Sequence, residues 1–144
     1  MKVVYNGCYG GFSISDAAIK RYAEIKGLTL YPEKDARWSS VTYWTVPENE
    51  RGAVLEGGAW ASASTEARIA SNEFYRNNTL GCREFERDDP VLVQVVEELG
   101  EKANGMCASL RIEDVPKGAL WRIDEYDGNE TVATQDSYEW KVAS

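Results

Sequence analysis

The segment from Asp88 to Gly105 constrains the fold most strongly, because it carries the start, the periodicity and the end of one helix. Asp89 is a strong N-cap residue, and Pro90 suits the first helical position. The apolar residues that follow recur at helical spacing and form one stripe, whereas most residues between them are charged or polar. The stripe consists of Leu92, Val95, Val96, Leu99 and Ala103. The sequence therefore predicts an amphipathic helix that ends at Asn104–Gly105.

The residues after this helix change to the two-residue period of β-strands. Apolar and polar residues alternate over residues 106–112, and a second strand pattern covers residues 120–126. Asp127–Gly128 is a typical dipeptide of a tight hairpin, and a returning strand follows it at residues 130–134. Residues 138–142 are a candidate for one more strand. Short turns between neighbouring strands predict an antiparallel sheet.

The N-terminal part predicts a further strand and a second helix. Residues 3–5 are β-branched or aromatic, and the glycine-rich turn Gly7–Phe12 ends that strand. A helix then begins at Ser13 or Ser15, both of which are good N-cap residues, and Gly27 is a natural stop. The expected fold class is α+β: a mostly antiparallel β-sheet packed with two main helices, one near each end of the sequence.

Residues 33–82 have weaker periodicity than the flanking sequence, so we expect an inserted middle segment within a single domain of residues 1–144. Before it, residues 28–31 form an extended piece that Pro32 ends. Within it, residues 41–46 predict a strand and residues 64–72 a short helix. Of the aromatic residues here, Trp38, Trp44, Trp60 and Phe74 are expected to fill a core or a subunit interface.

The sequence contains no histidine, which excludes hydrolases and metal sites that depend on imidazole. Its formal net charge of −8 disfavours binding of long nucleic acid, which relies on many cationic contacts to phosphates. The three cysteines, Cys8, Cys82 and Cys107, are far apart, so neither a metal site nor a disulfide framework is expected. No segment is typical of a signal peptide or a membrane span, and we expect a reduced cytoplasmic protein without metal or cofactor.

The glycine-rich turn is the first candidate site. Backbone amides near a helix N-terminus attract phosphate, and glycines let a ligand approach closely. The turn lacks the Lys-Ser/Thr ending of a P-loop, so its specificity as a motif is low. The alternative is a tight structural turn whose aromatic residues, Tyr9 and Phe12, join the core. Cys8 is expected to be a small buried residue rather than an activated thiolate, because it has no histidine partner.

The late hairpin is the second candidate site. Alternation places Trp121, Ile123 and Glu125 on one face and Arg122, Asp124 and Tyr126 on the other. Glu125 at the rim is suited to accept hydrogen bonds from ribose hydroxyls. Taken alone, however, the motif favours the alternative, a solvated acidic turn. Arg111 projects from the polar face of its strand, where it would clamp a phosphate or lie on the surface. Arg83 and Arg87 are expected to be surface charges.

Two parts of the chain together resemble a family of small phage and prophage proteins. The first is Val4-Tyr5-Asn6-Gly7-Cys8-Tyr9-Gly10-Gly11-Phe12-Ser13, and the second runs from Arg87-Asp88-Asp89-Pro90 to Asp127-Gly128. The chain is similar to the first-described Thoeris anti-defence family, whose members bind cyclic ADP-ribose isomers made by TIR-domain immune enzymes and do not degrade them. The middle segment and the acidic ending Gln135–Trp140 depart from the short form of that family.

The resemblance implies a non-catalytic sponge for a small cyclic nucleotide signal, acting as a homo-oligomer, a dimer or hexamer, in the cytoplasm of the infected bacterial host. Some members also hold cyclic oligonucleotides. Two alternatives stay open: an enzyme that degrades nucleotide signals, and an acidic inhibitor that binds a host enzyme. The expected ligand-binding residues, which rest mainly on the physical argument, are Tyr9, Gly10, Gly11, Phe12, Ser13, Arg111, Trp121, Glu125 and Tyr126.

Overall fold

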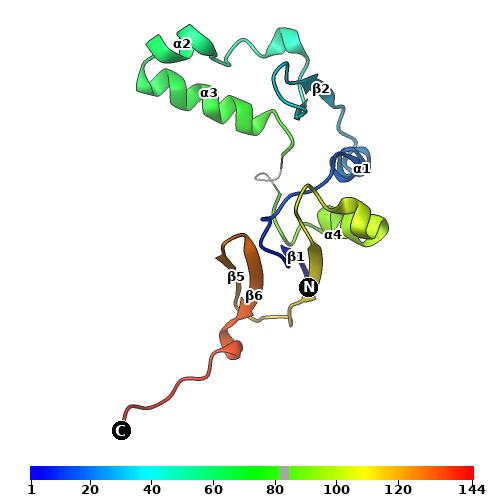
Figure 1. Cartoon of the computed structure of the whole chain (residues 1–144), viewed down its shortest axis with the longest axis vertical. Coiled ribbons are helices and arrows are strands. Elements are labelled where there is room, and N and C mark those ends of the chain that lie inside the picture. The colour runs from blue at the N-terminus through cyan, green and yellow to red at the C-terminus, as the bar shows by residue number, and fades with distance from the viewer. Residues whose placement is uncertain (82–84) are drawn as a thin grey trace. The chain divides into compact units, whose positions relative to one another are not determined.

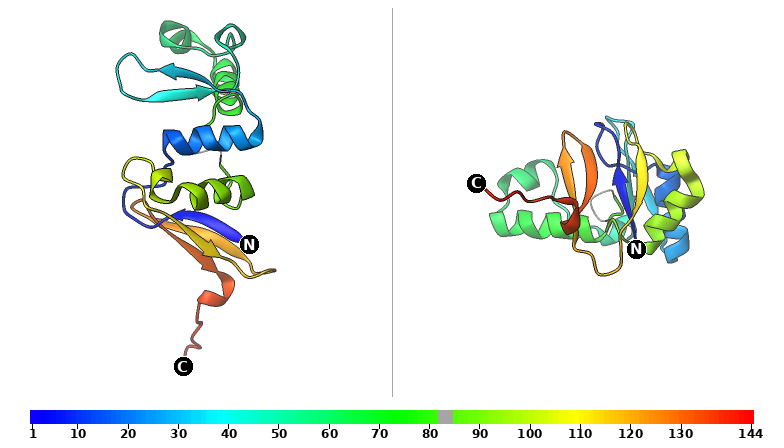
Figure 2. Two further views of the ribbon diagram at one scale, coloured as in Figure 1. Left: turned by 90° about the vertical axis from the view of Figure 1, so that its right-hand side faces the viewer. Right: turned by 90° about the horizontal axis from the view of Figure 1, so that it is seen from below.

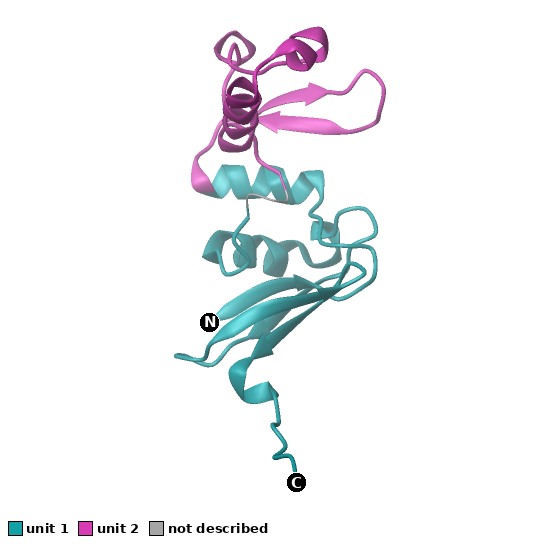
Figure 3. Ribbon diagram, turned by 90° about the vertical axis from the view of Figure 1, so that its left-hand side faces the viewer, with its two compact units in different colours: residues 1–25, 85–144 teal, residues 26–84 magenta. Residues whose placement is uncertain are grey.

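The computed structural model describes residues 1–81 and 85–144. The chain divides into two compact units (Figure 3). Residues 1–25 and 85–144 form the first unit, and residues 26–84 form the second. The second unit therefore interrupts the sequence of the first, in the region where the sequence indicates an insertion.

The strands of the first unit pair as two antiparallel two-stranded sheets, β1 with β4 and β5 with β6. Their bounds are β1 Lys2–Asn6, β4 Leu110–Asp114, β5 Trp121–Tyr126 and β6 Asn129–Thr134 (Figure 1). Asp127 and Gly128 connect β5 to β6 with φ values of 51° and 85°, the left-handed pair that a type I′ turn requires. β6 also lies beside β1. The predicted hairpin and the α+β class are confirmed.

The two main helices of the first unit are α1 (Asp16–Lys26) and α4 (Pro90–Leu99). Ser15, rather than Ser13, caps α1, because the amide of Ala18 donates to its hydroxyl at 3.1 Å. Asp89 caps α4 by accepting from the amide of Val91 at 2.8 Å. α4 packs against β1 and β4, and α1 lies on α4 (Figure 2).

Polar contacts join the middle of α1 to both ends of α4. Arg21 forms an ion pair with Glu98 at 2.8 Å, and this contact lowers the pKa of Glu98 to about 2. The Tyr22 hydroxyl donates to Asp89. Burial, together with this hydrogen bond, raises the pKa of Tyr22, so the hydroxyl keeps its proton at neutral pH.

The core of the first unit lies between the helices and β1. The neighbouring residues Val3 and Val4 point to opposite faces of β1, yet both are fully buried. β1 is therefore covered on both faces. The other side chains of this core are Ile14, Ala18, Ile19, Tyr22, Ala23, Phe85, Leu92, Val93, Val95, Val96, Ala103, Val115 and Ala133.

The second unit combines one hairpin with helices. Its elements are β2 Tyr31–Lys34, β3 Val41–Trp44, η1 Glu48–Glu50, α2 Gly57–Ser62 and α3 Thr65–Asn77. Trp44, which is 3% exposed, packs edge-on against Tyr75 and beneath the guanidinium of Arg51. Trp44 thus belongs to a core as expected, whereas Trp38 is 73% exposed.

Several expected boundaries are wrong. α4 ends at Leu99, because Gly100 adopts a positive φ of 56° and the chain continues as the 3₁₀ turn η3 (Gly100–Ala103). The expected strand at residues 106–112 begins only at residue 110, because residues 106–109 form a turn in which Cys107 has a φ of 64°. Met106 is consequently 89% exposed.

Some expected elements of the second unit and of the C-terminal residues also differ from the structure. β2 continues through Pro32, opposite Tyr43, instead of ending there. α3 extends beyond the expected residue 72, and α2 is a helix that the sequence analysis did not predict. Residues 138–142 form no strand; the 3₁₀ turn η4 (Gln135–Ser137) precedes them.

Cys82 and Arg83 lie outside the described residues. None of the helices in the described ranges combines the length and the apolar character that a membrane crossing requires.

Candidate functional site

The glycine-rich turn is held by close backbone contacts within the first unit. A Cβ at Gly10 would lie 1.6 Å from the carbonyl oxygen of Cys107. A Cβ at Gly128 would lie 2.6 Å from the carbonyl oxygen of Tyr9 and 2.7 Å from the amide nitrogen of Gly11. Glycine at positions 10 and 128 is therefore needed for packing of the turn against the loop before β4 and against the hairpin tip.

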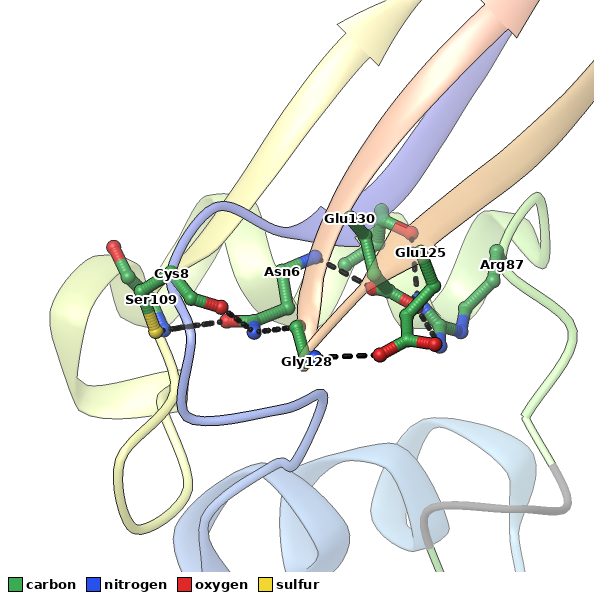
Figure 4. A network of polar contacts seen from close by, with 8 residues as sticks. Asn6, Cys8, Arg87, Ser109, Glu125, Gly128 and Glu130 are labelled. Atoms are coloured by element: carbon green, nitrogen blue, oxygen red, sulfur yellow. Dashed lines mark hydrogen bonds and ion pairs between the residues drawn. The ribbon is translucent and has the colours of Figure 1, made fainter.

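Asn6, at the end of β1, fixes the inner side of the turn (Figure 4). Its side chain is fully buried and donates to the carbonyl oxygens of Cys8 at 2.7 Å and Gly128 at 2.8 Å. Its amide oxygen accepts from the Ser109 amide at 2.8 Å and from the Cys8 thiol at 3.3 Å. One side chain thus ties together three segments that are far apart in the sequence.

A buried ion pair continues this network. Arg87 donates to the two carboxylate oxygens of Glu130 at 2.7 and 2.8 Å, and the backbone amide of Asn6 donates to Glu130 at 2.8 Å (Figure 4). Glu130 is 7% exposed. The Arg87 guanidinium also lies 3.4 Å from the centroid of the Phe12 ring. The expectation that Arg87 is a surface charge is wrong, because its partners come from distant segments.

The turn also contains hydrogen-bond donors that have no partner among the described residues. In residues 1–81 and 85–144, the backbone amides of Tyr9, Gly10 and Phe12 have no hydrogen-bond acceptor, whereas the nitrogen of Gly11 lies against Gly128 at the hairpin tip. These amides precede the capped start of α1, so they belong to the turn and not to the first turn of the helix. The hydroxyl of Ser13 differs, because it donates to the carbonyl oxygen of Met106 at 3.2 Å.

Arg111 lies beside this turn. It is exposed on β4, opposite Tyr5, and its side chain crosses Gly7, where a Cβ would lie 2.5 Å from Nε. Among the described residues its guanidinium has neither a hydrogen-bond nor an ion-pair partner. Arg111 therefore presents a full set of donors next to the glycine-rich turn.

The structure divides the expected hairpin residues between two places. Glu125 and Tyr126 lie at the hairpin tip with the glycine-rich turn; Glu125 accepts from the Gly128 amide, and Tyr126 is 79% exposed. Trp121 lies at the other end of β5, about 17 Å away along the strand. There it lines an open groove of about 340 Å³ together with Tyr138 and Trp140.

No protein-family model, curated protein or solved structure matches this chain. The candidate site therefore rests on its own geometry. That geometry offers free backbone amides, one unpaired guanidinium and the 67% exposed ring of Tyr9. Within the described residues, no group of three cysteine, aspartate or glutamate side chains is placed to hold a metal ion.

Sequence reasoning missed the residues that build the site, as distinct from those that line it. Asn6, Arg87 and Glu130 carry the buried network, and no local pattern marks Arg87 or Glu130. For Asn6 one signal was available: an asparagine at the end of a strand and before a glycine is suited to fix a turn by side-chain bonds to the backbone.

Proposed function

We propose that this protein binds a compact phosphorylated nucleotide signal of the cyclic ADP-ribose type and holds it without degrading it. In this proposal the chain is a phage sponge that acts in the cytoplasm of the infected bacterium and blocks TIR-dependent Thoeris immunity. The observation that carries the proposal is the unpaired Arg111 guanidinium beside a turn with three free amides. Such donors are the groups that bind a diphosphate.

The negative net charge of the chain makes these hydrogen-bond donors more important for binding an anionic ligand. A protein with a net charge of −8 repels an anionic ligand at long range, but salt screens that field beyond about 8 Å. Binding then depends on groups in direct contact with the ligand. Neutral amides and one arginine supply attraction at contact distance, and the exposed Tyr9 ring is available to stack on an adenine base.

Binding of the ligand without a catalysed reaction also agrees with the side chains present. The sequence has no histidine to act as a general base. Glu130 is engaged by Arg87 and by the Asn6 amide. Glu125 accepts a hydrogen bond from Gly128 and remains exposed at the hairpin tip, where it is suited to accept from ribose hydroxyls.

A thermal-shift panel of cyclic ADP-ribose isomers and cyclic di- and trinucleotides tests the proposal. We expect at least one cyclic ADP-ribose isomer to raise the melting temperature. We expect Arg111→Ala to weaken binding about 10- to 150-fold, because hydrogen bonds to charged groups contribute about 1.5–3 kcal/mol. Arg76→Ala, which removes an exposed arginine from α3, is the matched control and should bind like the parent.

The fate of the ligand separates the proposal from its alternatives. A sponge releases intact ligand when the complex is heat-denatured, whereas a degrading enzyme returns fragments. An inhibitor that binds a host enzyme shows no thermal shift with any nucleotide of the panel. Fragments, or the absence of any shift, would each refute the proposed function, and equal binding by Arg111→Ala would refute the diphosphate contact.

A further inference from the structure

The outer edge of β5 carries backbone groups that point away from the hairpin. The amide of Gln135 donates to the carbonyl oxygen of Leu120 at 3.0 Å, so residue 120 directs its backbone groups toward β6. Because this direction alternates along an antiparallel strand, Arg122, Asp124 and Tyr126 also face β6. The amides and carbonyls of residues 121, 123 and 125 therefore face outward.

This edge has no partner strand in the described residues. β6, the other strand of the hairpin, lies beside β1, and β5 forms the opposite side of the hairpin (Figure 1). No residue of the described ranges bonds to the outward backbone groups of Trp121, Ile123 or Glu125. Open edges of this kind pair readily with another strand unless charge, proline or a bulge protects them.

We propose that β5 pairs with β5 of a second copy of this chain, antiparallel, with Ile123 facing Ile123 on the two-fold axis. This arrangement places the outward groups of both strands opposite each other and forms about six backbone hydrogen bonds. It joins two hairpins into one four-stranded sheet. An isologous pairing of this kind closes after two copies and does not grow into a fibre.

The side chains of β5 are complementary to themselves in this register. Arg122 lies opposite Asp124 of the second copy, and the symmetric contact repeats the pair. Leu120, which is 68% exposed, lies opposite Tyr126, which is 79% exposed. Each copy therefore offers an opposite charge and an exposed apolar side chain at the matching positions.

The neighbouring registers lack this complementarity. A shift of the pairing by two residues in one direction places Arg122 opposite Arg122, and a shift in the other direction places Asp124 opposite Asp124. Like charges directly opposite each other destabilise a strand pair. Arg122 and Asp124 already form an ion pair within one strand at 2.7 Å, so the dimer would unite four charges of alternating sign.

Sedimentation velocity on the full chain tests this inference. We expect the mass to approach twice the 16.1 kDa of one chain as concentration rises. Arg122→Asp alone and Asp124→Arg alone should each weaken self-association at least tenfold, because each places like charges across the axis. An equimolar mixture of the two variants should recover the dimer, since each aspartate then faces an arginine of the other variant.

Two controls keep the outcome decisive. Arg76→Asp makes the same change of charge on α3 and should not alter the mass, while far-UV circular dichroism confirms that each variant is folded. Ile123→Pro removes one outward amide, does not break a backbone bond to β6, and should also give the monomer.

A parent that stays monomeric at all soluble concentrations overturns the proposal, as does a mixture that fails to recover the dimer. Nucleotide binding enters none of these measurements, so they stand apart from the proposed function.

Discussion

Replacement of Glu130 by glutamine should destabilise the first unit strongly. Glu130 is 7% exposed and accepts three hydrogen bonds, two from the Arg87 guanidinium and one from the Asn6 amide. Glutamine conserves the volume but removes the charge, and its amide nitrogen would face a donor. The substitution therefore leaves a partly buried guanidinium without its counter-ion and one buried donor without an acceptor.

The expected cost follows from the burial of the pair. Removal of one partner from a buried ion pair costs about 3–5 kcal/mol. The Arg87 side chain is 21% exposed and retains some hydration, so we expect a value near the lower limit, about 3 kcal/mol. For a unit of this size, a loss of 1 kcal/mol lowers the melting temperature by about 4–8 °C, so the expected decrease is about 12–24 °C.

Urea unfolding of the parent and of Glu130→Gln, followed by far-UV circular dichroism, measures this difference. The control is the double variant Arg87→Met/Glu130→Leu, which removes both charges. Because it leaves no buried ion unpaired, it should be more stable than Glu130→Gln alone. A free energy of unfolding for Glu130→Gln within about 1 kcal/mol of the parent would show that solvent compensates Arg87 and that the network is not a major source of stability.

Two further substitutions probe the elements that position the turn. Gly10→Ala should destabilise the first unit by more than about 2 kcal/mol in the same urea experiment, because its Cβ would collide with the Cys107 carbonyl at 1.6 Å; a stable variant would mean that this loop moves freely. Asp89→Ala should cost about 1–2 kcal/mol, since it removes the cap of α4 and the acceptor of Tyr22, whereas Tyr22→Phe, which keeps the cap, should cost less; equal losses would contradict the capping role.

Elements with strong local signals were predictable from the sequence. Asp89 and Pro90 define the start of α4, and Asp127–Gly128 defines the tip of the β5–β6 hairpin. In both cases the backbone conformation depends on residues within four positions of one another. The α+β class follows from such elements, because helix and strand periods alternate along the chain.

The elements that were predicted wrongly depend on contacts between segments that are distant in the sequence. Apolar and polar residues alternate over residues 106–109 as in a strand. These residues instead form a turn that contacts Gly10 and Asn6 from the other end of the chain. The environment of Arg87 was also predicted wrongly. Its neighbours in the sequence are charged, which is typical of an exposed segment beside a helix. Only the fold brings Glu130 to it, 43 positions away.

Different groups of the glycine-rich turn serve its structural role and the binding role that we propose for it. The inner side of the turn is fixed by the buried Asn6 and by the close approach of Gly128, so its backbone is held before any ligand arrives. The free amides and Arg111 lie outside this network. A turn that is already ordered spares a ligand the entropic cost of ordering it, and this would favour the proposed binding even though the site offers few contacts.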